Sequence, residues 1–367
     1  MVPRRCPVVC VLLTGARMPS RSLARRFAVV LALAALAPLA GVPIACGGAT
    51  ASSAASSDAG VDGAFHPGQP GPDAAPEATP DVAPEAAPHP LANALLLFSG
   101  DGPDFFTDTW EWDGTLWTQR NVTGPPGRYD HATAALHGKV VLFGGSGVSG
   151  YLGDTWEWDG VSWTQKNIPG PSPRGGHRMT TNGDKIVLFG GSGDASDDCD
   201  TWEYDGTAWT QTSATLTVGL HCIGHAIAAL NGTVYLFGGV GAESDTWAYD
   251  GTAWTKVSTT GPVGRAFTSM TTLGSNIVLF GGEVDANHIV NDTWTWNGTA
   301  WTEQTLATAP SPRWHAGMAT FENAVLVFGG DGAAGWLGDT WLYDGTKWLE
   351  WKGDGPSARY TYTLASR

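Results

Sequence analysis

Residues 139–163, KVVLFGGSGVSGYLGDTWEWDGVSW, contain the elements that decide the fold. An aliphatic run ends at Phe143 and two glycines, an Asp-Thr-Trp element follows at Trp156, and a lone Trp stands seven residues later at Trp163. An Asp-Gly dipeptide separates the two Trp residues. Between aromatic runs this dipeptide is typical of a tight β-hairpin, because both turn residues need positive φ. The stretch therefore predicts short antiparallel strands joined by tight turns.

The same elements recur six times in the same order. The Phe before the glycine pair is spaced by 45, 46, 48, 43 and 48 residues, at Phe98, Phe143, Phe189, Phe237, Phe280 and Phe328. The Asp-Thr-Trp element recurs at Trp110, Trp156, Trp202, Trp247, Trp294 and Trp341, and the lone Trp at Trp117, Trp163, Trp209, Trp254, Trp301 and Trp348. Upstream, residues 128–136 and 139–145 predict a further strand pair turning at His137. Four antiparallel strands per repeat are typical of a propeller blade.

This succession of aliphatic run, Gly-Gly, aromatic strand and following Trp resembles the kelch-repeat family over residues 91–367, including the central domain of galactose oxidase. The resemblance implies an all-β, six-bladed β-propeller with the first strand of each blade at the axis. The chain enters the domain in the second strand of a blade, at residues 94–98, and leaves through a first strand, at residues 359–364. We expect this C-terminal strand to pair with the three N-terminal strands, because ring closure covers both open sheet edges.

The N-terminal 46 residues predict a signal peptide. Basic residues at Arg21, Arg25 and Arg26 precede an apolar run at 27–39, which is too short to span a bilayer. The run ends in a sequence around Cys46 that resembles a bacterial lipoprotein cleavage site, where the Cys thiol is lipidated. A plain secretory signal is the alternative.

A start at Met18 would give a better-proportioned signal than Met1. Residues 47–90 consist almost wholly of Ala, Pro, Ser, Gly, Asp and Glu, which predicts a disordered tether. The expected organisation is a signal peptide (1–46), a tether (47–90) and a propeller (91–367). We therefore expect a lipid-anchored protein of the bacterial cell envelope, at the outer membrane or the periplasmic face, that contacts the membrane only through its anchor.

The charge balance argues against one class of partner. Six of the 20 basic residues and none of the 35 acidic ones lie in the first 46 residues, so 14 basic residues face 35 acidic ones in the remainder, a net charge of −21. A protein this acidic is unsuited to nucleic acid. We expect a monomer that binds a protein or a carbohydrate.

Candidate ligand-binding residues lie at the loops joining second to third strands and fourth to first strands, which emerge on one face. An Arg opens the first strand of five blades, at Arg128, Arg174, Arg265, Arg313 and Arg359. These could bind a carboxylate or an acidic sugar, since an Arg fork matches a carboxylate. Alternatively each pairs with an aspartate at the start of a third strand, the interpretation that we favour: Asp108, Asp154, Asp245, Asp292 or Asp339.

Aromatic residues on the same face are further candidates. The repeat-locked Trp residues are best explained by packing between blades. Trp314 and Trp336 break the repeat near predicted loops and are candidate ligand contacts, as are Tyr151, Phe105 and Phe106.

The fourth blade has Cys222 in the Arg position, and Cys199 precedes the third-strand residue Asp200 in the neighbouring blade. We predict a disulfide that replaces the local Arg-Asp contact, as suits an oxidising compartment.

His131, His177 and His225 occupy equivalent positions in consecutive blades. Symmetry spaces them around the axis, so we expect hydrogen bonding and no metal site. The acidic clusters at 101–104 and 194–200 lack the spacing of a calcium loop, although weak Ca²⁺ binding stays open.

The residues favour a binding or scaffold propeller without a cofactor, because no catalytic set is recognisable. The alternative is a periplasmic sugar-modifying enzyme. Six-bladed kelch propellers include sialic-acid mutarotases, and such an activity needs only an Arg and a carboxylate at the channel mouth.

Overall fold

The structure is a computed structural model that describes residues 93–103, 105–194, 198–216, 222–241, 244–285 and 288–367. The predicted signal peptide, Cys46 and the predicted tether lie outside these residues. The described residues form strands and no helix, and so they contain no helix that is long and apolar enough to cross a membrane.

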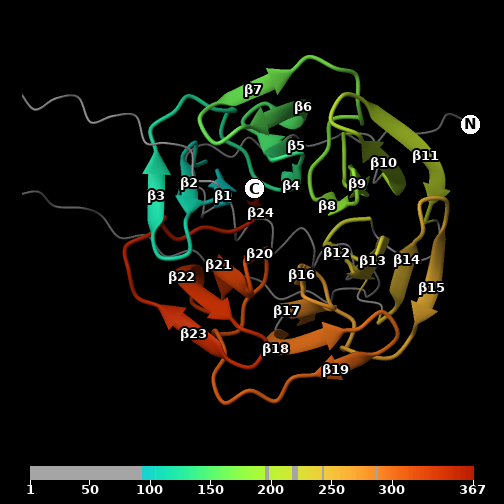
Figure 1. Ribbon diagram of the computed structural model, residues 1–367, viewed down its shortest axis with the longest axis vertical. Coiled ribbons are helices and arrows are strands. Elements are labelled where there is room, and N and C mark those ends of the chain that lie inside the picture. The colour runs from blue at the N-terminus through green and yellow to red at the C-terminus, as the bar shows by residue number, and fades with distance from the viewer. Residues whose placement is uncertain (1–92, 104, 195–197, 217–221, 242–243, 286–287) are drawn as a thin grey trace, which may run out of the picture. The chain divides into compact units, whose positions relative to one another are not determined.

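The described strands form six four-stranded antiparallel sheets arranged around an axis (Figure 1). We call the strands of a blade A to D from the axis outward. The A strands are β24 (Leu364–Ser366), β4 (Ala132–Leu136), β8 (Arg178–Asn182), β12 (His225–Leu230), β16 (Ser269–Leu273) and β20 (Gly317–Phe321). The B strands are β1 (Leu95–Phe98), β5 (Lys139–Gly147), β9 (Lys185–Phe189), β13 (Thr233–Gly238), β17 (Asn276–Asp285) and β21 (Ala324–Gly332).

The C and D strands complete the blades on the outside. The C strands are β2 (Thr109–Trp112), β6 (Gly150–Trp158), β10 (Asp200–Tyr204), β14 (Thr246–Tyr249), β18 (His288–Trp296) and β22 (Gly335–Tyr343). The D strands are β3 (Trp117–Arg120), β7 (Trp163–Lys166), β11 (Trp209–Thr215), β15 (Trp254–Ser258), β19 (Trp301–Glu303) and β23 (Trp348–Trp351). The predicted six-bladed propeller is confirmed, with the A strands innermost in Figure 1.

The first blade is built from both ends of the domain, as predicted. β24 pairs antiparallel with β1, with Leu97 opposite Leu364 and Leu95 opposite Ser366, and the sheet order is β24-β1-β2-β3. β24 also contacts the A strands β20 and β4 of the two neighbouring blades. The last three-residue strand therefore covers the edge of β1 and closes the ring.

The A strands begin later than the sequence predicted. β4 begins at Ala132, not at residue 128, and β24 at Leu364, not at residue 359. The reason is a left-handed residue two positions after each Arg, with φ of 55° at both Asp130 and Thr361. Such a residue cannot continue a strand, so the segment from the Arg turns before the strand starts.

One Trp per blade joins it to the preceding blade. The ring of each D-strand Trp packs on the B-strand Phe of the preceding blade with centroids 5.1–5.6 Å apart. Its indole N–H donates to the Thr of that blade's Asp-Thr-Trp element at 2.8–3.1 Å. The pair Trp117 and Thr340 makes the same bond between the first and sixth blades. These Trp residues are therefore packing residues.

The first glycine after each B-strand Phe is required by a close backbone approach. At Gly238, φ is 75°, and a Cβ would lie 2.3 Å from the carbonyl oxygen of Arg265. Ser99 replaces this glycine in the first blade and keeps the left-handed backbone at φ 59°. Its hydroxyl donates to the Arg128 carbonyl at 2.7 Å, so the serine turns the close approach into a hydrogen bond.

Removing residues 359–367 should abolish cooperative unfolding. The deletion exposes the edge of β1 and removes the contacts of β24 with both neighbouring blades. Thermal unfolding followed by circular dichroism and by calorimetry would test this. A truncated protein whose transition matches the full chain in midpoint and width would show that ring closure does not hold the domain together.

The indole–hydroxyl bond between blades should be measurable by a double-mutant cycle. Replacing Trp209 by Phe keeps most of the ring, and Thr155→Val removes the acceptor. We expect a coupling free energy of about 1 kcal/mol between these substitutions in chemical denaturation. Trp209→Phe combined with Thr299→Val, in a turn of another blade, is the matched control and should be additive. A coupling of zero for the first pair would mean that the Trp stabilises by ring packing alone.

Candidate functional site

The five predicted Arg residues are buried in pairs with aspartate. Each is at most 1% exposed, and its Nη1 atom lies 2.5–2.7 Å from the first carboxylate oxygen of the C-strand aspartate in its own blade. The second carboxylate oxygen accepts a bond from the indole of the Trp two residues later at 2.7–2.8 Å. The pairs are Arg128–Asp154, Arg174–Asp200, Arg265–Asp292, Arg313–Asp339 and Arg359–Asp108.

Backbone carbonyls complete the hydrogen bonding of these guanidinium groups. In Arg313, Nε donates to Ser311 at 3.0 Å and Nη1 donates to Gly329 at 3.1 Å, in addition to the Asp339 bonds. The geometry supports the interpretation of these Arg residues as structural, since their donors are engaged and their side chains are covered.

The carboxyl groups of these pairs stay ionised. Burial by itself raises the pKa of Asp108, but hydrogen bonds and charge attraction from Arg359, with a further bond from Trp110, lower it below its usual value overall. The same balance lowers the pKa of Asp339 against Arg313 and Trp341. Bidentate charge-assisted bonds of this kind are among the stronger ones in proteins.

One predicted aspartate partner was wrong. Asp200, not Asp245, pairs with Arg174, because Arg and Asp of a pair belong to the same blade. Asp245 belongs to the fourth blade, which has no Arg, and forms an ion pair with Lys256 of β15.

Cys222 occupies the Arg position of the fourth blade and forms a disulfide with Cys199 of the third blade. The Cα atoms are 5.2 Å apart, and the two positions are 23 residues apart in the sequence. The bond joins neighbouring blades on the face where the other blades carry an Arg-Asp pair, as the sequence predicted.

The three equivalent histidines are buried against the preceding blade. Each ring makes an edge contact with a B-strand Phe: His131 with Phe98, His177 with Phe143 and His225 with Phe189. Burial is the main cause that lowers the pKa of His131 and of His225 to about 3, with a further lowering by nearby Arg charges. His177 Nε2 lies 3.1 Å from the Phe143 carbonyl oxygen. No group of three metal-ligating residues occurs among the described residues.

A ring of left-handed residues forms the mouth of the axial channel on the face of the B-C and D-A loops. These residues have φ between 52° and 75° and stand one to three positions before each A strand: Asp130, Gly176, Gly224, Phe267, His315 and Thr361. Their backbone groups bond from blade to blade, as in Asp130 N to Thr361 O at 2.8 Å and His315 N to Phe267 O at 3.0 Å. This ring could not be recognised in the sequence, because four of its members are not glycine.

Aromatic rings gather on one side of the mouth, over the fifth, sixth and first blades. Trp314 stacks on His315 at 4.7 Å, and His315 contacts Phe267 at 4.1 Å and Tyr360 at 6.0 Å. Trp336 also stacks on Tyr360, with ring centroids 6.0 Å apart. We call Phe267, Trp314, His315, Trp336 and Tyr360 the aromatic cluster. All except the buried Tyr360 are partly exposed, so the structure brings the predicted Trp314 and Trp336 into one surface.

The other predicted aromatic candidates lie apart from this cluster. Tyr151 occupies the position in β6 that Trp336 has in β22, opposite Ser146. Phe105 contacts Tyr129 at 5.2 Å, and Phe106 lies under the guanidinium of Arg359 at 3.9 Å. In the predicted acidic clusters, Asp104 and residues 195–197 lie outside the described part of the chain.

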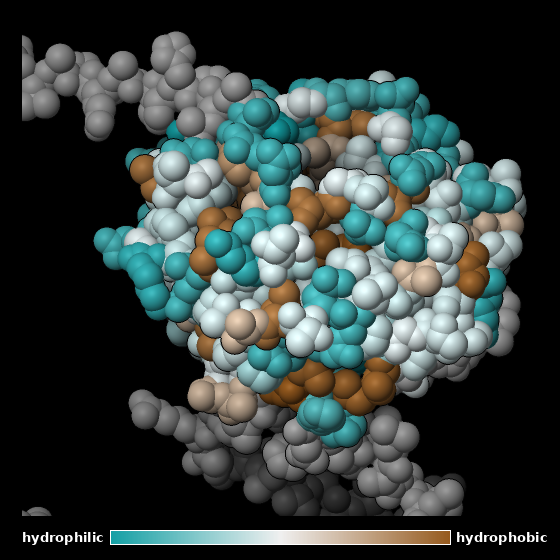
Figure 2. All heavy atoms as spheres, turned by 60° about the horizontal axis from the view of Figure 1, so that its bottom comes forward, coloured by the Kyte–Doolittle hydropathy of each residue, from teal (hydrophilic) through white to brown (hydrophobic). Residues whose placement is uncertain are grey.

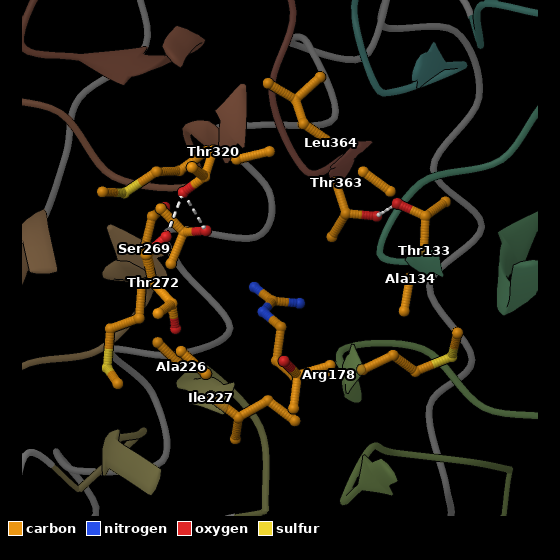
Figure 3. A pocket seen from close by; sticks show the side chains of 18 of the residues that line it. Thr133, Ala134, Arg178, Ala226, Ile227, Ser269, Thr272, Thr320, Thr363 and Leu364 are labelled. Atoms are coloured by element: carbon orange, nitrogen blue, oxygen red, sulfur yellow. Dashed lines mark hydrogen bonds between the residues drawn. The ribbon is translucent and has the colours of Figure 1, made fainter. Parts of the chain in front are cut away.

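The axial channel has a volume of about 300 Å³ and is lined by the A strands. Most lining residues are Ala, Thr, Ser and Met, and Arg178 is the charged residue among them. Figure 3 shows its guanidinium extending from β8 into the open space, with Thr133 and Thr363 on one side and Ser269 and Thr320 on the other. Arg178 was not among the residues predicted from the sequence. Its signal was an Arg directly after His177, where the other repeats carry Ala132, Ala226, Ser269, Gly317 and Thr363.

The protein is a closed β-propeller. Its repeated polar residues hold the blades together, and residues that depart from the repeat surround the channel. A family described as the KLHDC2/KLHL20/DRC7 Kelch-repeats domain matches residues 76–239 and 224–366. The chain therefore belongs to the kelch-repeat family. No curated protein matches it.

The buried histidines should make stability fall with acid. An unfolded His gains its proton near pH 6.5, whereas His131 and His225 gain theirs at about 3 in the folded protein. Protonation therefore favours the unfolded chain. Their contribution is complete above pH 6.5 and is lost progressively below it, by at most about 1.4 kcal/mol per pH unit for each His.

We expect His225→Thr, which introduces the residue at the equivalent position 268, to weaken the pH dependence of the unfolding free energy between pH 6 and pH 5. The reduction should be at most about 1.4 kcal/mol per pH unit, because one buried His no longer gains a proton on unfolding. Urea unfolding at several pH values measures it. Thr268→Ser is the matched control and should leave the slope unchanged. An unchanged slope in His225→Thr would contradict the buried neutral state of this His.

Proposed function

We propose that this protein is an envelope-anchored binding or scaffold propeller that recognises a protein or carbohydrate ligand through its B-C and D-A loop face. The lipid on Cys46 would hold it outside the cytoplasm, and the acidic tether would carry the propeller. Kelch propellers commonly bind protein partners. One observation carries the proposal: repeated polar residues are engaged inside the ring, whereas the unrepeated aromatic cluster is partly exposed beside the channel mouth.

The chemistry of the aromatic cluster suits recognition of planar or apolar groups. Aromatic rings that stack and remain partly exposed are the residues that carry binding energy in protein interfaces, and they also stack on sugar rings. Acidic groups border the cluster: Asp331 pairs with Trp314 through backbone bonds, and Asp101 accepts the Tyr360 hydroxyl at 3.0 Å. A ligand with apolar or aromatic groups and some positive charge fits this surface.

The remaining surface supports this choice of site. Figure 2 shows a surface that is largely hydrophilic or near neutral, with hydrophobic residues in separate groups. The large hydrophobic side chains that are exposed among the described residues come from different blades and loops: Leu116, Val148, Val161, Val257, Val263 and Leu349. Scattered exposed apolar residues are normal, whereas a cluster of five rings at a channel mouth is not.

The alternative of a sugar-modifying enzyme has less support. It requires an accessible Arg and a carboxylate at the mouth. The five predicted Arg residues are covered and bonded to aspartate, which favours binding without chemistry as the function of this face.

A photo-cross-linking amino acid at position 336 should capture a ligand on this face. In cells that express the full chain, we expect an adduct of one defined mass from position 336 and none from position 349, an exposed site on β23. Trp314→Ala should weaken capture, since truncation of a central aromatic contact costs about 2 kcal/mol, roughly thirtyfold in affinity. Mass spectrometry then identifies the adduct as protein or glycan.

Equal labelling from positions 336 and 349 would show that the face has no preferred ligand. Labelling that is unaffected by Trp314→Ala would place the ligand elsewhere. The Trp314→Ala protein should keep the wild-type melting temperature within a few degrees, which separates loss of binding from loss of folding.

A further inference from the structure

Among the described residues that line the axial channel, Arg178 is the one charged side chain in an otherwise neutral lining. Arg178 opens β8 opposite Phe189, in the register where Ala132, Ala226, Ser269 and Gly317 stand opposite their own B-strand Phe. Because the equivalent residues are small, the side chain has room to extend toward the axis, as Figure 3 shows.

The guanidinium of Arg178 lacks the aspartate partner that the five Arg residues before the A strands have. Among the described residues its hydrogen bond is from Nη1 to the His177 carbonyl at 3.2 Å, and no carboxylate lies within ion-pair distance. Asp130 at the mouth attracts it only over a longer distance, and burial lowers the pKa of Arg178. An Arg has five N–H donors, so most of these donors point into the channel without a protein acceptor.

The neighbouring polar groups do not supply a negative charge. Hydroxyls around the channel bond to one another across blades, as in Thr133 with Thr363 at 2.8 Å and Thr271 with Thr320 at 3.1 Å. Burial, and with it the charge of Arg178, lowers the pKa of the neighbouring His131, His177 and His225, so these rings are neutral. A partly enclosed cation without a counterion costs folding free energy, which an anionic ligand would recover.

We propose that the axial channel binds a small oxyanion, a carboxylate or phosphate group carried by a small hydroxylated molecule, through the guanidinium of Arg178. An Arg fork matches both groups in a bidentate manner. The single positive charge fits a single negative one, and the channel volume of about 300 Å³ limits the ligand to a small molecule. The ligand enters at the mouth, past His315 and Thr361, which also line the channel. This site is separate from the aromatic cluster and does not depend on the function proposed for that surface.

The test uses the purified full chain with gluconate, inorganic phosphate and glucose as probes at constant ionic strength. Gluconate or phosphate should raise the melting temperature saturably, by about 5 °C or more at a hundredfold excess over Kd. Gluconate and phosphate together separate a carboxylate ligand from a phosphate ligand. Glucose, which is hydroxylated but neutral, should cause no shift.

Arg178→Met should abolish the shift, and Arg178→Lys should weaken binding tenfold or more, because Lys keeps the charge without the fork. Without ligand, Arg178→Met should melt at or above the wild-type temperature, since it removes a charge without a counterion. Lys352→Met, at the exposed residue directly after β23, is the control for loss of one positive charge and should bind as wild type.

Two results would overturn the proposal. The first is a shift that survives in Arg178→Met or that glucose reproduces, because binding would then not depend on the guanidinium. The second is an Arg178→Met protein that is less stable than the wild type and no oxyanion shift in either protein, since Arg178 would then serve the fold alone.

Discussion

The indole of the D-strand Trp makes the contact through which each blade holds its neighbour. Its ring covers the B-strand Phe of the preceding blade, and its N–H donates to the Thr in the Asp-Thr-Trp element of that blade. A blade alone is a four-stranded sheet with two apolar faces, so it gains stability only when both faces are covered. Because the contact also joins the first blade to the sixth, through Trp117 and Phe328, the ring has no uncovered end.

The Arg-Asp-Trp unit has the corresponding role on the loop face. The guanidinium bonds an aspartate of the same blade and a backbone carbonyl beside the glycine pair, so it fixes the turn before strand A against strands B and C. A buried ion pair contributes little net stability by itself, but its partners must be complete once it is buried. In the fourth blade both positions of the Arg-Asp pair differ. Cys222 stands in the Arg position and is bonded to Cys199, and Asp245 forms an ion pair with Lys256. Each Arg-Asp-Trp unit therefore lies within a single blade, and the fourth blade has other contacts in its place.

The blades and the closure of the ring could be predicted from the sequence because they depend on local signals that recur. An Asp-Gly turn between aromatic runs specifies a hairpin wherever it occurs, and the unmatched strands at both ends can satisfy each other only by pairing. The start of strand A could not be predicted, because a left-handed Phe267 or Thr361 has no residue signature. Asp245 was wrongly expected among the aspartate partners in place of Asp200, because recurrence shows that Arg and Asp pair but not which copies share a blade. The place of Arg178 in the channel could be recognised only from the strand register, because an Arg directly after a His looks in the sequence like one more residue of the repeat.

Residues of functional interest lie at positions where the side chain departs from the repeat but the backbone conformation does not. The mouth residues keep φ near 55° whether the residue is Asp130, Phe267, His315 or Thr361, although a non-glycine residue in this conformation costs about 1 kcal/mol or more. Inter-blade backbone bonds hold that geometry, so the side chains can differ without a change of fold. The same reasoning applies one layer deeper, where small residues and Arg178 share one register position. A ring whose structural contacts are made by repeated residues leaves its axis and mouth free to vary, and this is where unrepeated aromatic rings and an unpaired cation are found.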